Sequence, residues 1–243
     1  MLLAGMVAAG WLPALAWAEP TAQEILDRAD DTVDIKLSQV DLEMLVYRNN
    51  ELRKTYRMAL RYQDADHTMA ETSFPPRNQG EKMLQAGRGN YWLFLPNLNK
   101  AVRISESNSF SNGDFSNGDI LSPRLSNEYD AKLLGVETAN AVEMYKLELT
   151  ARNDSVAYAK IIYWIRRSDF FPIRREYYTF SQQLLKRLDF SVTGNAMPKG
   201  LPDTLLMTSV LERDKKTVIR YTKYTPVKAF PPGTFDENNL MRR

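Results

Sequence analysis

The feature that most constrains the fold is an alternation of apolar and polar residues that begins at Gln39 and returns, segment after segment, as far as Tyr224. Apolar side chains occupy every second position from Val40 to Val46, and again from Tyr56 to Tyr62. Successive side chains of a β-strand point to opposite faces of its sheet. The pattern therefore predicts antiparallel strands with one dry and one wet face.

Short polar turns separate these segments, among them Asn49-Asn50, Arg167-Ser168-Asp169 and Arg213-Asp214-Lys215. Consecutive hairpins of this kind form a meander, and about a dozen antiparallel strands in one open sheet must curl strongly. We therefore expect a mainly β (α+β) fold, built on an open, strongly curved antiparallel sheet. No linker interrupts the pattern, so residues 19–243 are predicted to form a single domain.

A helix is predicted before the strands, from Thr21 to Asp34. Thr21 and Glu24 have the spacing of a capping box, in which each side chain bonds to the backbone N–H of the other residue. Because carboxylate clusters without a loop geometry seldom hold a metal tightly, the aspartates of this helix are expected on its solvated side. These aspartates are Asp27, Asp30, Asp31 and Asp34.

The first 18 residues carry no charge and end in the small-residue pattern Ala16-Trp17-Ala18. This is typical of a secretory signal peptide cut after Ala18. The alternative, a membrane anchor, is disfavoured because a span needs about 20 apolar residues. No cysteine follows the cleavage site, so we expect an exported periplasmic protein that is not lipidated there.

The composition leaves little room for catalysis. The chain has no cysteine, one histidine (His67) and a net charge of +2. These values exclude thiol chemistry and argue against a histidine-rich metal site and against a nucleic-acid partner. The sequence also lacks a nucleophile elbow, a phosphate-binding loop and a zinc-protease motif. We therefore expect no enzyme, no cofactor and no metal.

A polar segment interrupts the strands directly after the aromatic hairpin around Tyr91–Leu95. It contains a tandem repeat, Phe110-Ser-Asn-Gly-Asp114 and Phe115-Ser-Asn-Gly-Asp119. The two aspartates could hold a cation or do acid–base work, but Asn, Gly and Asp more often form turns and helix caps. We expect this segment to be a lid over the sheet, with Asp114, Phe115, Asp119 and Ile120 as its main residues.

The predicted dry faces are rich in methionine, leucine and aromatic residues. An ordinary core is the alternative for any one of them. Together they form an apolar face larger than one helix and a short lid can cover. An uncovered apolar face in a soluble protein indicates a binding groove. The expected groove residues are Leu42, Met44, Met58, Leu60, Met83, Trp92, Phe94, Ile162, Trp164, Tyr177, Leu188, Phe190, Leu205 and Met207.

Three motifs are shared with a known family: Tyr91-Trp92 with Pro96, Asp114-Phe115-Ser116 with Asp119, and Tyr163-Trp164-Ile165. With the strand order around them, they make the chain resemble the outer-membrane lipoprotein-sorting proteins. The closer likeness is to the LolA-like branch associated with RND/MMPL-type exporters. The chain departs from the family pattern at Gly118, where an acidic residue is usual, and at Asn112-Gly113, which is more polar than the pattern.

The resemblance implies an incomplete barrel around helices, with a lipid-sized cavity and no catalytic residues. It implies a periplasmic carrier of lipid or acylated lipoprotein, which we expect to be a monomer with an inner-membrane RND/MMPL-type transporter as a partner. Two alternatives stay open. One is a periplasmic sensor that binds a protein on the same fold, and the other is an enzyme that uses His67 or Asp114.

Overall fold

The computed structural model describes residues 19–35, 37–122, 124–154 and 156–241. The predicted signal peptide lies outside the described residues. Among those described, no helix is long and apolar enough to cross a membrane.

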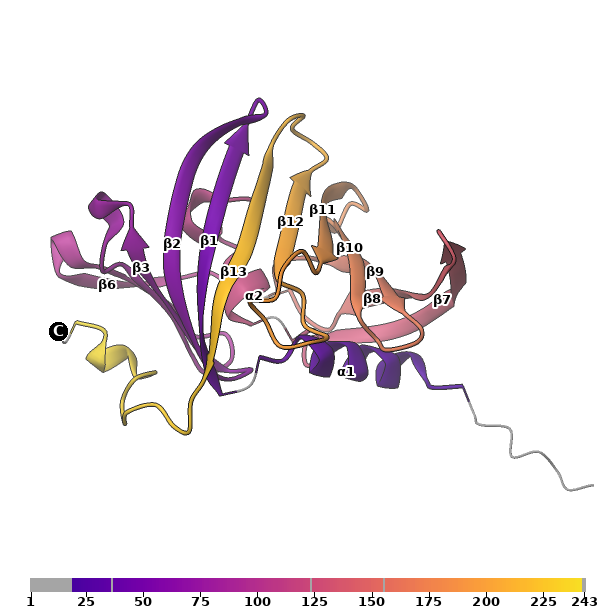
Figure 1. Cartoon of the computed structure of the whole chain (residues 1–243), viewed down its shortest axis with the longest axis horizontal. Helices are drawn as coiled ribbons and strands as arrows, with labels where there is room; N and C mark the ends of the chain where they lie inside the picture. Colours follow the sequence, from indigo (N-terminus) through magenta and orange to yellow (C-terminus); the bar gives the residue numbers. More distant parts are fainter. Residues whose placement is uncertain (1–18, 36, 123, 155, 242–243) are drawn as a thin grey trace, which may run out of the picture.

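One antiparallel sheet of 13 strands forms the body of the molecule (Figure 1). The expectation of an open, curved antiparallel sheet is confirmed. Each strand pairs with the next along the chain except at β6 and β7, which do not pair with each other; instead β1 pairs with β13 in the middle of the sheet. The strands of the N-terminal half are β1 (Ser38–Arg48), β2 (Glu51–Asp64), β3 (His67–Phe74), β4 (Lys82–Ala86), β5 (Tyr91–Leu95) and β6 (Lys100–Ile104).

The strands of the C-terminal half form the other side of the sheet, from β13 beside β1 to β7 at the edge. Its strands are β7 (Tyr129–Ala139), β8 (Val142–Ala151), β9 (Lys160–Arg166), β10 (Pro172–Tyr178), β11 (Leu184–Ser191), β12 (Thr204–Ser209) and β13 (Lys216–Pro226). The two ends of the sheet are therefore β6 and β7, which are neighbours in sequence. Residues 105–128 join these two edges and carry the predicted lid, with the short helix α2 (Asn117–Leu121).

Helix α1 (Ala22–Val33) begins with the predicted capping box: Thr21 accepts from the backbone N–H of Glu24, whose side chain bonds back to the N–H of Thr21. The helix lies below β7 to β10 in Figure 1 and buries Ile25, Leu26 and Ala29 in the main core. Asp30 is buried as well, only 1% exposed, so its expected place on the solvated side is wrong. It follows Ala29 and lies one turn after Leu26, which brings it to the edge of the apolar face.

The segment after β13 covers part of the convex face of the sheet. Its Leu240 is buried in a second apolar cluster with Met69, Leu84 and Phe94. Phe235 and Trp92 pack against the same cluster. The sheet is thus covered on both faces at β3, where the lid lies on the concave side, while α1 covers the concave side at β7 and β10.

Candidate ligand-binding site

The second half of the tandem repeat starts the lid helix α2. Ser116 is its N-cap and accepts a bond from the backbone N–H of Asp119. The carboxylate of Asp119 accepts from the backbone N–H of Ser116 at 2.8 Å and from the hydroxyl of Tyr158 at 2.7 Å. The repeat does form a helix cap, as expected, but the N-cap is Ser116, and Asp119 completes the capping box from the third helical position. Through Tyr158 the cap also fastens the lid to the segment before β9.

The first half of the repeat is anchored to the middle of the sheet through Asp114. Its Oδ2 accepts from Thr217 at 2.6 Å and pairs with Arg48 at 3.1 Å. Its backbone N–H donates to the Thr217 hydroxyl, and its carbonyl accepts from Lys186 at 2.6 Å. These contacts hold the lid on β1, β11 and β13.

Apolar side chains of the lid fill most of the concave face. Phe110 and Leu121 are fully buried, while Phe115 and Ile120 are only 1% and 4% exposed. Burying side chains of this size is worth about 1.5–3 kcal/mol each. The expected open groove is therefore wrong for this conformation, because the repeat supplies far more apolar cover than its polar residues indicate.

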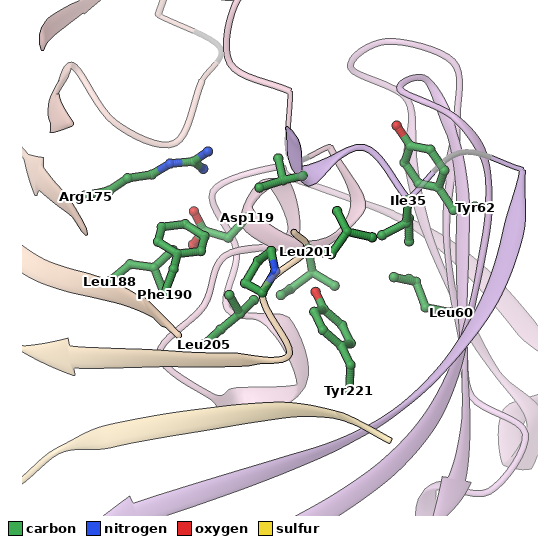
Figure 2. A pocket seen from close by; sticks show the side chains of 13 residues that line it. Ile35, Leu60, Tyr62, Asp119, Arg175, Leu188, Phe190, Leu201, Leu205 and Tyr221 are labelled. Atoms are coloured by element: carbon green, nitrogen blue, oxygen red, sulfur yellow. The ribbon is translucent and has the colours of Figure 1, made fainter. Parts of the chain in front are cut away.

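A small cavity is left between the lid, the end of α1 and the loop before β12 (Figure 2). Its volume is about 50 Å³. A buried water needs about 10–15 Å³, so the closed cavity fits a small chemical group and not a whole lipid chain. It is lined by Val33, Ile35, Leu60, Tyr62, Asp119, Ile120, Arg175, Leu188, Phe190, Leu201, Pro202, Leu205 and Tyr221.

Most of the predicted groove residues do lie on the concave face. Four of them, Leu60, Leu188, Phe190 and Leu205, line the cavity. The others on this face belong to the main core, which α1 and the lid cover: Leu42, Met44, Met58, Met83, Tyr177 and Met207.

The other four predicted groove residues lie on the convex face, so their expected placement is wrong. Trp92 and Phe94 belong to the cluster under the C-terminal segment. Trp164 donates to Glu137 at 2.8 Å, and Ile162 lies two residues before it on the same face of β9. The strands β5 and β9 are apolar on both faces, so their alternation could not decide which face is inward.

The inward residues of these two strands are Tyr91, Leu93, Ile161, Tyr163 and Ile165.

The main residue that sequence reasoning missed is Arg175 on β10. It lines the cavity and is only 4% exposed. Its Nη2 donates to the hydroxyl of Tyr163 at 3.0 Å. A signal was present in the sequence: Arg175 is two residues before Tyr177, so the period of two places both on the same face.

Burial controls the protonation of the groups around the cavity. It raises the pKa of Asp30, although the nearby Arg175 acts in the opposite direction. It also raises the pKa of the Tyr158 hydroxyl, with Asp119 adding to the effect, so this tyrosine stays protonated and donates. At the lid, burial together with Glu128 and Asp119 raises the pKa of Glu106 to about 7.

These groups do not form a recognisable catalytic arrangement. His67 pairs with Asp64 at 2.8 Å at the turn between β2 and β3, away from the lid aspartates. No cluster of three or more histidine, aspartate or glutamate side chains suited to a metal ion occurs in the described part of the chain. What the site offers is an apolar enclosure with one buried cation.

Solved structures with the same architecture define the class of protein. The LolA superfamily protein NE2245 from Nitrosomonas europaea superposes with a TM-score of 0.82 at 25% identity, covering 90% of this chain and 99% of its own. A domain assigned to outer membrane lipoprotein sorting from Vibrio parahaemolyticus gives 0.79 at 22% identity, covering 91% and 98%. A DUF1329 family protein from Desulfovibrio piger gives 0.76 at 23% identity, covering 91% and 100%.

The fold is thus that of the LolA superfamily. No curated protein matches the chain significantly. A family model described as "Uncharacterized protein" matches residues 64–242, and the chain belongs to that family.

Proposed function

We propose that the protein is a periplasmic carrier that binds lipid or lipoprotein acyl chains on the concave face of its sheet. The observation that carries the proposal is the apolar concave face closed by a separate segment, residues 105–128, which is held there by four buried apolar side chains and by the polar contacts of Asp114 and Asp119. The LolA-like fold supports the same reading. Acyl chains would leave water for this face at about 0.8 kcal/mol per buried CH₂.

Loading requires the lid to move, because the closed cavity of about 50 Å³ is too small for an acyl chain. The lid would leave with Phe110 and Phe115, and the hydrocarbon of the cargo would take their place on the sheet. On release, the same side chains would return. Cargo and lid would thus compete for one surface, which keeps that surface out of water in both states.

The remaining parts of the proposal rest on the sequence. Export through a signal peptide, absence of lipidation and a single domain over residues 19–243 follow from the sequence pattern. Hand-over to an inner-membrane RND/MMPL-type transporter by a monomeric carrier follows from the family resemblance.

The test uses the mature protein, purified from periplasm without detergent and analysed by native mass spectrometry and lipid extraction. A discrete adduct that extracts as a lipid is expected. Leu201→Glu places a charge in the cavity wall, on a loop outside the sheet, and should abolish the adduct. Leu206→Glu is the matched control, because Leu206 is also half-buried but pairs with Asp189 and Val218 on the convex face.

An adduct that survives Leu201→Glu would place the cargo elsewhere. A wild-type protein that neither carries nor takes up lipid would refute the carrier function. That outcome favours the second candidate, a sensor that binds a protein partner. The edge strand β7 supports this candidate, because it exposes Leu133, Leu134 and Val136.

A further inference from the structure

From the environment of Arg175 we infer that the cargo is an anionic amphiphile, whose carboxylate or phosphate pairs with this guanidinium. The inference rests on the proposed carrier function and narrows its cargo. The hydrocarbon part of the ligand would lie against the apolar wall of the cavity.

Arg175 is a buried cation whose charge is only partly compensated, because the buried Asp30 acts on it electrostatically without forming a direct salt bridge in the described part of the chain. One nitrogen donates to Tyr163, and the guanidinium lies 4.5 Å from the ring of Tyr163 and 5.1 Å from that of Phe190. Its Nε has no hydrogen-bond partner. Among the described residues no carboxylate lies within salt-bridge distance of the guanidinium, and Asp30 interacts with it only through the longer-range attraction of opposite charges. Arginine keeps its charge in proteins, and buried charges are normally paired, so this side chain favours an incoming anion.

The two acidic groups around Arg175 have hydrogen-bond partners of their own and form no direct salt bridge with it. Asp119 shares the cavity wall, but its Oδ2 already accepts from Ser116, Tyr158 and Lys186, and Lys186 compensates its charge. Asp30 accepts from the backbone N–H of Ser126 at 2.7 Å through Oδ2. Burial favours its protonated form.

Unused hydrogen-bonding capacity gathers in the same part of the core. Besides Nε of Arg175, the buried atoms without a hydrogen-bond partner include the hydroxyl of Tyr177, which can donate to an acceptor. Buried polar groups in native proteins are seldom left unpaired. A ligand carboxylate or phosphate has several acceptor oxygens, and the guanidinium presents a planar fork that suits two of them.

The shape of the cavity fits an amphiphile in one orientation. Figure 2 shows Arg175 on one side, with Ile35, Leu60 and Tyr62 on the opposite side. The anionic end would therefore lie at β10, and the chain would run toward β2 and the end of α1. The closed cavity fits the anionic group, and the lid has to move to make room for the chain.

The experiment measures binding of four probes to the mature full-length protein by isothermal titration calorimetry. Hexadecanoic acid is compared with hexadecanol, its uncharged analogue, and phosphatidylglycerol is compared with diacylglycerol. Each anionic probe should bind about 10- to 100-fold more tightly than its neutral partner, the factor expected for a charge-assisted hydrogen bond. The stronger of the two preferences identifies the anion as carboxylate or phosphate.

Arg175→Met should remove the preference for the anionic probes, while Arg175→Lys should keep part of it. Arg174→Met is the matched control, because Arg174 is the next residue and pairs with Asp189 on the convex face at 2.6 Å. Near-ultraviolet circular dichroism checks that each variant is folded. The comparison of charged and neutral probes on the wild-type protein needs no variant, so it tests the preference for an anion even if Arg175→Met does not fold.

The outcomes separate the two proposals. Equal binding of charged and neutral probes, or a preference that survives Arg175→Met, would overturn the anionic site and leave the carrier function standing. An uncharged acylated lipopeptide is titrated as a fifth probe, and binding of this probe alone would also overturn the anionic site, in favour of a lipoprotein cargo. No binding of any probe would refute the carrier function itself.

Discussion

Glu106 makes the stability of the closed protein depend on pH. The backbone carbonyl of Glu106 accepts from Gly118 in the lid helix at 3.1 Å. Its side chain lies so close that a Cβ built on Gly118 would be 2.6 Å from it. Burial, followed by the negative charges of Glu128 and Asp119, raises the pKa of Glu106 from 4.5 to about 7.

The sign of the pH effect follows from the higher pKa of Glu106 in the folded protein than in the unfolded chain. The folded protein binds the proton of Glu106 more tightly than the unfolded chain does, so the contribution to stability is complete below pH 4.5. It is lost as the pH rises through about 7. The full pKa difference of Glu106 corresponds to about 3 kcal/mol of unfolding free energy. Because the side chain is partly exposed to solvent, the expected loss of stability is about 1–2 kcal/mol.

Glu106→Gln replaces this carboxyl with a neutral group of the same shape. Urea unfolding, followed by tryptophan fluorescence, should give similar free energies for both proteins at pH 4.5. At pH 8 the variant should be more stable than the wild type by about 1–2 kcal/mol. A difference between the two proteins that stays constant from pH 4.5 to 8 would refute the assignment of this pH dependence to Glu106.

Three further changes test the helix cap, the lid and the buried acid, all by urea unfolding. Thr21→Ala removes the capping box of α1 and should cost about 1 kcal/mol; no loss would mean that the cap contributes nothing to the folded protein. Phe115→Ala empties a fully buried site beneath the lid and should cost about 3–5 kcal/mol; a loss below 1 kcal/mol would show that the lid is not packed as described. Asp30→Ala leaves the N–H of Ser126 without its acceptor and should cost about 1–3 kcal/mol, whereas an unchanged midpoint would show that water replaces the carboxylate.

The sequence predicted the sheet well because its signals are local. Alternation identifies a strand from its own residues, and polar turns such as Asn49-Asn50 mark the hairpins. The capping box at Thr21 and the cap at Asp119 were also predictable, since each joins residues three positions apart.

The errors arose where the answer depends on distant parts of the chain. Trp92 and Trp164 lie in strands that are apolar on both faces, and only their neighbours decide which face is inward. For Trp92 the deciding neighbour is the segment that ends at Leu240, far along the sequence. The cover of the concave face was underestimated for a similar reason. Phe110 and Phe115 are the only large apolar residues of a polar repeat, yet both are buried against the sheet.

The order of the strands also determines how far the lid can travel. Because β1 and β13 hold the two halves together, the lid segment is a tether between the two free edges and carries no part of their pairing. Residues 105–128 would reach on the order of 80 Å if fully extended. Lifting this segment from the sheet would leave β6 paired with β5 and β7 paired with β8. A circular permutant opened within residues 105–128 would therefore keep every pair of neighbouring strands in the sheet.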